Sequence, residues 1–485
     1  MSKFLDFNHF LNDEENYKLL PFNFRELPSK KYLLTTISGE WHQLSFEKME
    51  SLIDGNLKSD DKDFQWLESK SFLYRENSKA NVSLAALKLR TKFSHIFNLT
   101  QLHIFVVTLR CEHSCPYCQV SRQNDDSSDE YDMSEETALS ALDIVFQSPS
   151  DTLKIEFQGG ESLLNFELIK FIVEHANEKA KQMSKYVEFV IATNLAPLTD
   201  EHINYCRLNN IQISTSLDGP RDVHNANRPK RGNNSYELAV DGIKRVRESI
   251  GVDYISALMT TTKSSIKHFR IIIDEYIDQG FQGIFLRPLS PYGFAVKTKW
   301  IDGYDVSEWM EAYKDGLEYI LELNKNGFKF TEFYSSLLLK RMFSPFSTGH
   351  VDLMHPSGAG LSGLVYNYDG TVFASDEGRM LAEMGKSNFE LGNVADNDFS
   401  SLISSEPLVE ALSESFGYVL PSCIDCAFLP FCGSDPVYHF ATQNSFGGLK
   451  AYSDFCNRHT ALFEHLFSLL DDPEVRPILM EWVKA

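Results

Sequence analysis

The stretch that decides the fold lies at residues 103–118, where the chain reads HIFVVTLRCEHSCPYC. Residues 103–109 form a mostly apolar run that is typical of a buried strand. Three cysteines follow it in a Cys-x3-Cys-x2-Cys spacing, namely Cys111, Cys115 and Cys118. The chain has 485 residues but only eight cysteines, and their grouping is unlike the dense pattern of a secreted disulfide scaffold. Clustered thiols of this kind indicate metal ligands or redox groups.

The composition is that of a globular protein with a strongly acidic balance. Hydrophobic residues make up 43% and charged residues 24%, and 36 phenylalanines supply ample volume for a core. The net charge of −22 argues against binding to nucleic acid or to an anionic membrane. No apolar run approaches the roughly 18 residues of a membrane span, and residues 1–16 are acidic where a signal peptide would be basic and then apolar. We therefore expect a cytoplasmic protein without nucleic-acid or membrane partners.

The central part of the chain alternates strand-like and helix-like segments. Short apolar runs predict six strands, at residues 103–109, 153–158, 187–194, 211–217, 254–260 and 283–288. The stretches between them predict helices, at residues 134–147, 166–183, 201–209, 236–250 and 266–279. Six strands separated by helices predict a parallel α/β sheet that forms an open or closed barrel.

Polar residues gather at the predicted carboxyl ends of these strands. The three cysteines follow the first strand, and the later strands contribute Gly159, Gly160, Glu161, Asn194 and Ser216. Because α/β barrels build their active sites at this end, the spacing alone predicts one shared pocket.

Three closely spaced thiolates suit an iron–sulfur cube with one open corner. Cys111, Cys115 and Cys118 can hold three irons of a [4Fe–4S] cluster, which leaves the fourth iron without a protein ligand. Catalysis at a metal centre requires such an open position. A zinc site that takes His113 as a fourth ligand is the alternative, although zinc motifs favour paired Cys-x2-Cys knuckles.

These residues resemble the motifs of the radical S-adenosylmethionine (radical SAM) enzymes. The family motif has an aromatic residue before its last cysteine, as Tyr117 stands here before Cys118. The resemblance implies a partial (β/α)6 barrel of the TIM type. It also implies that the open iron chelates SAM, and that an electron from the cluster cleaves SAM into methionine and a 5′-deoxyadenosyl radical.

The same resemblance implies SAM contacts at the strand ends. Gly159, Gly160 and Glu161 match the Gly-Gly-Glu element that bonds the SAM amino group, although Ser162 stands where the family usually has proline. The other contacts that it implies are Ser216 and Arg228 for the ribose and the carboxylate, Asn194 beside them, Tyr117 near the adenine, and Leu286 as a further adenine contact.

The second group of cysteines supplies a complete set of four sulfur ligands, which closes a cluster against substrate. Its members are Cys423, Cys426, Cys432 and Cys456. The segment resembles the SPASM extension of radical SAM enzymes that modify peptides, which usually holds two auxiliary clusters. Ser375 and Pro436 stand at two of the other cysteine positions. We therefore predict one auxiliary [4Fe–4S] cluster, with a structural zinc as the alternative.

Asp376 directly follows the missing cysteine at Ser375. Relatives that oxidise a sulfatase side chain place a catalytic base here. The resemblance therefore implies that Asp376 takes a proton as a substrate radical is oxidised. A turn or surface carboxylate is the alternative.

The pattern changes on both sides of the barrel. Residues 32–36 and 40–44 predict a hairpin, and helices are predicted near residues 46–53, 64–73, 306–324 and 333–342. Residues 364–368 and 372–374 predict a second hairpin around Asp369-Gly370. The predicted units are an N-terminal domain (1–95), a radical SAM core (96–300), a helical connection (301–349), a SPASM-like domain (350–457) and a C-terminal helix (458–485).

The N-terminal pattern resembles the winged-helix-like recognition domains fused to maturases of ribosomally synthesised peptides (RiPPs). Such domains bind a leader peptide as an added strand at a sheet edge. A domain that only packs on the barrel is the alternative. Taken whole, the chain resembles the B-type maturases of the His-Xaa-Ser system.

The sequence therefore predicts a radical SAM oxidoreductase that abstracts hydrogen from a precursor peptide and leaves a crosslink or an epimerised centre. Its partners would be the precursor peptide with its leader and a flavodoxin- or ferredoxin-type reductant. One alternative is an anaerobic sulfatase-maturing enzyme that forms formylglycine, although those relatives usually keep both auxiliary clusters. Another is a non-catalytic iron–sulfur sensor or scaffold, against which the intact Ser216 and Arg228 argue.

Overall fold

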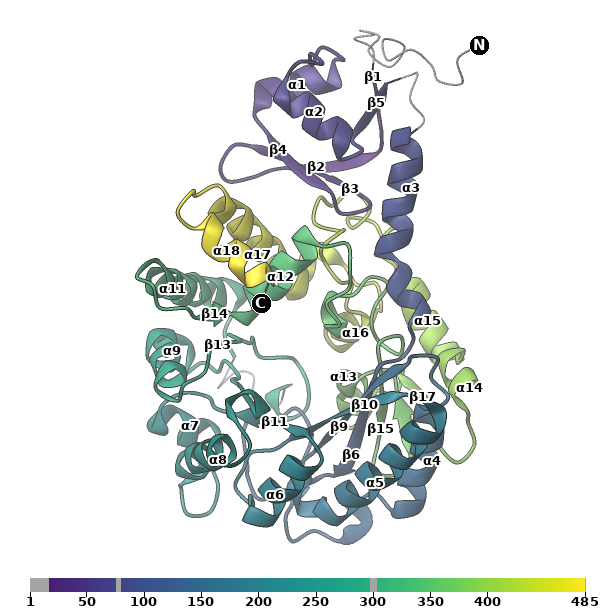
Figure 1. Ribbon diagram of the computed structural model, residues 1–485, viewed down its shortest axis with the longest axis vertical. Helices are drawn as coiled ribbons and strands as arrows, with labels where there is room; N and C mark the ends of the chain where they lie inside the picture. Colours follow the sequence, from purple (N-terminus) through teal and green to yellow (C-terminus); the bar gives the residue numbers. More distant parts are fainter. Residues whose placement is uncertain (1–16, 76–79, 297–302, 485) are drawn as a thin grey trace.

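One eight-stranded sheet forms the centre of the computed structural model, which describes residues 17–75, 80–296 and 303–484. Its strands, in spatial order, are β12 (Ile255–Leu258), β11 (Ile211–Ser216), β10 (Tyr186–Ala192), β9 (Thr152–Gly159), β6 (Leu102–Thr108), β15 (Gly363–Tyr366), β16 (Thr371–Phe373) and β17 (Glu390–Asn393). The strands from β12 to β15 run parallel, and the last two are antiparallel (Figure 1). This arrangement confirms the predicted partial α/β barrel.

Helices follow the barrel strands at each predicted position and lie on the outside of the sheet (Figure 1). They are α4 (Glu135–Val145), α5 (Phe166–Met183), α6 (Asp200–Leu208), α8 (Ser235–Ser249) and α9 (Phe269–Asp278), with the unpredicted α7 (Arg221–Asn227) before α8. Local sequence sets their starts: the Ser134 hydroxyl accepts a hydrogen bond from Thr137 N at 3.1 Å and caps α4. One face of each is apolar and packs on the sheet, as Ile169 and Ile172 of α5 do.

The sixth predicted strand is much shorter than expected. Only Gly283–Ile284 forms a strand, β13, and it pairs with β14 (Thr331–Glu332) instead of joining the main sheet. The prediction of a strand over residues 283–288 is therefore wrong beyond residue 284. The reason is a tight turn, since Arg287 N donates to Phe285 O at 2.8 Å. Thr261 N nevertheless donates to Arg287 O at 3.0 Å, so this segment stays beside the chain that follows β12.

The C-terminal hairpin is built into the barrel sheet. β15 and β16 are antiparallel, as predicted, around a turn in which Gly370 has a φ of +86°. β15 also pairs in parallel with β6, so that Tyr366 lies opposite Phe105. This pairing was not predicted, and it places the end of β16 against the barrel.

The rest of the chain from residue 303 is mainly helical. Its helices are α11 (Val306–Lys325), α12 (Phe333–Phe343), α13 (Asp376–Ala382), α14 (Phe399–Ile403), α15 (Glu406–Glu414), α16 (Pro436–Gln443), α17 (Asp454–Leu470) and α18 (Arg476–Lys484). One buried apolar core joins them to the barrel, and it includes Leu142, Leu317, Leu381 and Leu466. In the described residues, no helix is both long enough and apolar enough to cross a membrane.

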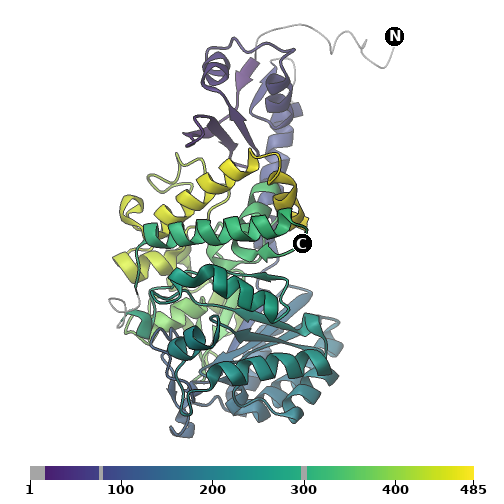
Figure 2. The same ribbon diagram turned by 90° about the vertical axis from the view of Figure 1, so that its left-hand side faces the viewer.

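The N-terminal part folds around a core of its own, which includes Leu34, Leu52 and Phe64. Its elements are β1 (Tyr17–Leu19), β2 (Phe22–Glu26), β3 (Tyr32–Thr36), β4 (Trp41–Leu44), α1 (Phe46–Ile53), α2 (Lys62–Ser69) and β5 (Leu73–Arg75). The predicted hairpin is β3–β4, and β2 completes an antiparallel sheet with β3 in the middle. The unpredicted helix α3 (Ala80–Lys92) leads to the barrel. Figure 2 shows this part at one end of the molecule, beside the C-terminal helices.

Candidate active site

A cavity of about 260 Å³ lies at the carboxyl ends of the parallel strands. It collects side chains from the segments that follow β6, β9, β10, β11 and β12, and from the start of α13. The predicted site residues that line it are Cys111, Cys115, Tyr117, Cys118, Gly159, Gly160, Asn194, Ser216, Arg228 and Asp376. The fold therefore brings together residues that are spread over more than half of the chain.

The three cysteines of the first group occupy a short loop beside this cavity. Cys111 ends β7 (Arg110–Cys111), which pairs with β8 (Gln123–Asn124). Cys118 N donates to Cys115 O at 3.1 Å, so a tight turn joins the last two cysteines. Burial raises the pKa of the Cys115 thiol to about 12 and that of Cys111 well above its usual range. Buried thiols of this kind become thiolates when a cationic metal group binds them.

The donor set of this wall consists of three sulfurs. Cys111, Cys115 and Cys118 all line the same cavity. Three thiolates suit a [4Fe–4S] cluster with one open iron, and this assignment stays a prediction.

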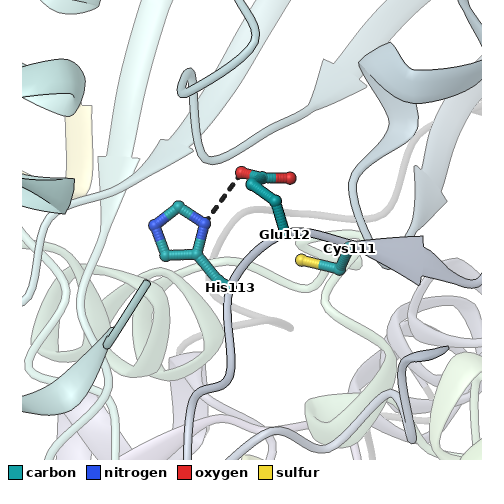
Figure 3. A group of neighbouring side chains, drawn as sticks. All are labelled: Cys111, Glu112 and His113. Carbon is teal, nitrogen blue, oxygen red and sulfur yellow. Dashed lines mark hydrogen bonds and ion pairs between the residues drawn. The ribbon is translucent and has the colours of Figure 1, made fainter. Parts of the chain in front are cut away.

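Cys111 does belong to one compact set of potential ligands, together with Glu112 and His113 (Figure 3). His113 is 3% exposed, and its Nδ1–H donates to the Glu112 carboxylate at 2.8 Å. His113 is the residue that the zinc alternative would use as its fourth ligand. The Nδ1 atom of His113 is hydrogen-bonded to Glu112. Cys115 and Cys118 do not belong to the compact set of Cys111, Glu112 and His113.

The Gly-Gly-Glu element fastens the ends of three strands together. A Cβ atom on Gly160 would lie 2.4 Å from the carbonyl oxygens of Leu109 and Arg110, so only glycine fits there. The buried Glu161 carboxylate accepts hydrogen bonds from Thr193 Oγ1 at 2.6 Å and from Asn194 N at 2.7 Å. Glu161 thus lies behind the cavity and does not line it. It positions Asn194, whose Nδ2 lies 3.9 Å from Cys111 Sγ.

Arg228 and Tyr117 meet at Asp218, a residue that the sequence analysis does not single out. Asp218 is fully buried, and Arg228 Nε donates to its Oδ2 at 3.0 Å. The Tyr117 hydroxyl donates to the same oxygen, and the guanidinium lies 5.5 Å from the centre of the Tyr117 ring. Burial disfavours the charged guanidinium, but the Asp218 carboxylate outweighs it and raises the pKa of Arg228. The available signal was the position of Asp218 in the Ser-Leu-Asp-Gly turn, two residues after Ser216.

Leu286 does not reach the cavity. Its side chain is fully buried and packs against Gly316 of α11. A Cβ atom added to Gly316 would lie 3.3 Å from Leu286 Cδ1. The predicted adenine contact from this position is therefore not supported, because the turn after β13 directs the side chain to the helix layer. The next residue, Arg287, lines the cavity instead.

Two carboxyl groups also line the cavity, those of Asp376 and Glu156. Asp376 is the first residue of α13, where Ser375 caps the helix, and its Oδ1 accepts a hydrogen bond from Arg379 Nε at 3.3 Å. Glu156 of β9 also lines the cavity, and burial, together with repulsion from Asp376, raises its pKa. The sequence analysis missed Glu156 because the strand pattern alone does not show which face a residue takes. This pair can exchange protons with a bound substrate.

The second group of cysteines lines a separate cavity of about 50 Å³. Cys423, Cys426 and Cys432 lie on the loop between α15 and α16, and Cys456 lies in the first turn of α17. Burial raises the pKa of the Cys423 thiol to about 11. Four sulfur donors in one cavity suit a [4Fe–4S] cluster and also a structural zinc, so the auxiliary cluster stays a prediction.

The N-terminal domain is hydrogen-bonded to this cysteine loop. Asn23 Nδ2 donates to Cys426 O at 3.1 Å, and Thr35 Oγ1 donates to Ala427 O at 2.8 Å. From α3, the buried Lys92 Nζ donates to Pro430 O at 2.7 Å. The loop that carries three potential metal ligands is therefore held by the domain expected to recognise a peptide.

A larger groove, of about 730 Å³, runs along β4. Its walls come from the N-terminal domain, from α3, from the end of α12 and from the turn between α17 and α18. Apolar side chains such as Trp41 and Phe343 line it beside charged ones such as Lys88 and Asp471. Among the strands of the described residues, β4 pairs only with β3, so β4 is an edge strand and the groove runs along its outer edge.

Comparison with known proteins identifies the barrel. Residues 105–274 match the Radical SAM superfamily, so this segment is a radical SAM domain, and such a domain implies SAM and a [4Fe–4S] cluster. Over 443 residues the chain is 22% identical to the radical SAM cyclopropyl synthase TigE of Paramaledivibacter caminithermalis, covering 87% of this chain and 82% of TigE. A protein of Methanocaldococcus jannaschii without an assigned function is 32% identical over 141 residues, but the match spans only 46% of its length.

Solved structures share the fold. Native anSMEcpe with bound AdoMet superposes with a TM-score of 0.64 at 18% identity, over 77% of this chain and 99% of that one. Streptococcus suis SuiB bound to S-adenosylmethionine superposes with a TM-score of 0.51 at 14% identity, over 90% of this chain and 99% of SuiB. At these identities the likeness shows the architecture alone.

Proposed function

We propose that this radical SAM enzyme modifies a ribosomally synthesised precursor peptide, forming a crosslink or an epimerised centre. One observation carries the proposal: a single cavity joins the three cysteines and the SAM-site residues to two substrate-side carboxyl groups, Glu156 and Asp376. The similarity to a radical SAM cyclopropyl synthase over 87% of the chain supports it.

We assign two roles to the residues of the cavity, the binding of SAM with its cluster and the transfer of protons from the substrate. A [4Fe–4S] cluster on Cys111, Cys115 and Cys118 would supply the electron that cleaves SAM to a 5′-deoxyadenosyl radical. Arg228, held by Asp218, would bind the SAM carboxylate, and Ser216 would bind the ribose; both residues line the cavity. The Gly159-Gly160 backbone forms the wall beside the cysteines.

Asp376 is the proposed proton acceptor on the substrate side. It lines the cavity, and its carboxylate forms an ion pair with Arg379. It can take the proton released when a substrate radical loses an electron, and Glu156 beside it is the second acceptor. This placement also favours a second candidate function, the oxidation of a cysteine or serine side chain to formylglycine.

The groove along β4 is the proposed leader site. A peptide strand that adds to the free edge of β4 would gain backbone hydrogen bonds, and the side chains of the groove would set its register. The antiparallel register pairs Leu34 with His42. Thr36 N donates to Glu40 O, so this pair is hydrogen-bonded, and in an antiparallel ladder every second pair from it is hydrogen-bonded too. Trp41 and Gln43 belong to the pairs in between, so their backbone N–H and C=O groups point away from β3, toward the free edge of β4.

The proposal also includes one auxiliary [4Fe–4S] cluster, held by the four cysteines of the second group. Cys423, Cys426, Cys432 and Cys456 close its coordination, so it would exchange electrons and not bind SAM. A flavodoxin- or ferredoxin-type protein is the proposed reductant.

The decisive experiment is anaerobic co-expression with a candidate precursor peptide encoded beside the gene. Mass spectrometry should find a loss of two hydrogens per crosslink, or deuterium at one α-carbon after turnover in D2O for an epimerase. A variant with Cys111, Cys115 and Cys118 replaced by alanine is the control and should leave the peptide unchanged. Formylglycine in the peptide would support the second candidate, and a protein that does not cleave SAM under dithionite would refute both.

A further inference from the structure

Lys450 is the one formally charged side chain, apart from the thiols, among the described residues that line the four-cysteine cavity. It is 8% exposed and begins a short 3₁₀ helix, Lys450–Tyr452. The other titratable group in the lining, His459, stays neutral because burial lowers its pKa to about 3. The lining of this cavity therefore includes four cysteines and one lysine.

The partner of this ammonium group is neutral. Lys450 Nζ bonds to His439 Nε2 at 3.2 Å, and within the described chain it has no carboxylate within ion-pair distance. His439 Nδ1 donates to the carbonyl oxygen of Asp435 at 2.6 Å, which leaves Nε2 as an acceptor. Burial and the charge of Lys450 lower the pKa of His439 to about 4, so the imidazole carries no charge near neutral pH.

A buried ammonium that faces only a neutral acceptor is costly unless an anion lies nearby. A cluster bound to the four cysteines of the same cavity would supply that anion, because its ligands would be thiolates. Four thiolates around a [4Fe–4S] cube carry a net negative charge, and reduction by one electron makes it more negative. A fixed positive charge in the wall therefore stabilises the reduced form more than the oxidised form.

We propose that Lys450 is a positioning residue for the auxiliary cluster, whose counter-charge raises the reduction potential of that cluster. The inference rests on the cluster assigned above to Cys423, Cys426, Cys432 and Cys456. The couple concerned takes up one electron without a change of ligand or proton. A higher potential would make the cluster a better acceptor for the electron that a substrate radical gives up.

Hydrogen bonds also connect the Lys450–His439 pair to Cys456, one of the four proposed ligands. Ser453 Oγ lies 2.9 Å from His439 Nε2 and accepts a hydrogen bond from Cys456 N at 3.2 Å. Removal of Lys450 could thus act through charge or through the placement of Cys456. Substitutions that keep the length of the Lys450 side chain but remove its charge distinguish an effect of the charge from an effect on the placement of Cys456.

The test uses the full chain with Cys111, Cys115 and Cys118 changed to alanine, so that only the auxiliary cluster is present. Lys450→Met and Lys450→Gln remove the charge, and Lys450→Arg keeps it. Lys386→Met is the matched control, because Lys386 donates to Asn444 Oδ1 at 2.7 Å and does not line the cavity. After anaerobic reconstitution, iron content is measured and the reduction potential is determined by redox titration followed by electron paramagnetic resonance.

In Lys450→Met we expect about a tenfold lower ratio of reduced to oxidised cluster at a fixed potential, which equals about 59 mV for a one-electron couple. Lys450→Arg and Lys386→Met should match the parent. If the neutral variants lose iron while Lys450→Arg keeps it, the charge serves cluster formation, and the assigned effect on the reduction potential is overturned.

An unchanged potential in an iron-loaded Lys450→Met variant would overturn the proposal, as would loss of iron from Lys450→Arg as well. A parent that binds zinc or no metal would instead refute the auxiliary cluster, and this role with it. The proposed peptide chemistry, which is measured separately by mass spectrometry, would remain standing.

Discussion

Arg228 and Asp218 form a buried ion pair in the wall of the active-site cavity, with Arg228 Nε 3.0 Å from the Asp218 carboxylate. The side chain of Asp218 is 0% exposed and that of Arg228 is 13% exposed. Asp218 also accepts a hydrogen bond from Thr260 N at 3.2 Å, so it connects the segments after β11 and β12. The residue expected to bind the SAM carboxylate is therefore oriented by a carboxylate of the protein itself.

Asp218→Asn should weaken both the fold and the binding of SAM. The change leaves the Arg228 guanidinium partly buried without its counter-charge, which costs about 3 kcal/mol of unfolding free energy. We also expect the Kd for SAM to rise at least about tenfold, since Arg228 and Tyr117 lose their shared anchor. Urea unfolding and anaerobic equilibrium dialysis measure the two effects. Asp222→Asn, an exposed residue of α7, is the control, and an Asp218→Asn protein that matches it would contradict this role.

The two cysteine groups should lose their metal independently. Reconstituted protein should contain about eight irons per chain, and alanine at Cys111, Cys115 and Cys118 should leave about four and abolish deoxyadenosine formation. Alanine at Cys423, Cys426 and Cys432 should also leave about four irons, but SAM cleavage under dithionite should persist. Iron analysis and chromatography of deoxyadenosine provide the measurements, and about twelve irons would show that a third cluster is present.

Asp376→Asn should uncouple SAM cleavage from peptide modification. The amide cannot accept a proton, so we expect product formation to fall at least about 100-fold while deoxyadenosine still accumulates. Peptide mass spectrometry and deoxyadenosine assays on the same sample give the ratio. Glu156→Gln is the companion variant, and a loss of product there with normal turnover in Asp376→Asn would transfer the role to Glu156.

The edge of β4 should be sensitive to proline. Gln43→Pro removes an outward backbone N–H that a bound strand would use, yet proline is tolerated on an edge strand. We expect at least about a tenfold rise in the Kd for the leader peptide, measured by fluorescence anisotropy, with unchanged iron content. Phe24→Pro on β2, the opposite edge of the same sheet, is the matched control. Equal losses in both variants would indicate a general disturbance of the domain and not a β4 site.

Stability should fall as the pH rises through neutrality, in part because of Glu377. Burial and the neighbouring Asp352 and Asp376 raise the pKa of Glu377 to about 8, whereas an unfolded glutamate titrates near 4.3. The folded state thus binds the extra proton, and stability falls between about pH 4 and pH 8. Glu377→Gln should remove about 2.5 kcal/mol of this loss between pH 6 and pH 8.5, measured by urea unfolding. The exposed Glu410→Gln is the control, and identical pH profiles of Glu377→Gln and the parent would rule this contribution out.

The strands and helices of the barrel could be predicted because each one shows a local pattern of apolar and polar residues. Five of the six predicted strands join the main sheet, and the cysteines, Gly159 and Ser216 meet at one edge because parallel strands place their carboxyl ends together. The pattern failed at residues 283–288, where the apolar run is strand-like but a turn at Phe285 ends the ladder. Local propensity does not show where a hydrogen-bond partner is missing.

The sequence by itself determined the grouping of the thiols, one group of three and one of four, on a parallel α/β scaffold. Spacing along the chain fixes such features because the ligands of each group lie mostly within one loop. Only the tertiary structure decided that Asp218 holds Arg228, that β15 joins β6, and that the N-terminal domain bonds to the cysteine loop. Those contacts join residues far apart in the chain, and burial, which makes them consequential, is a property of the packed molecule and not of any segment.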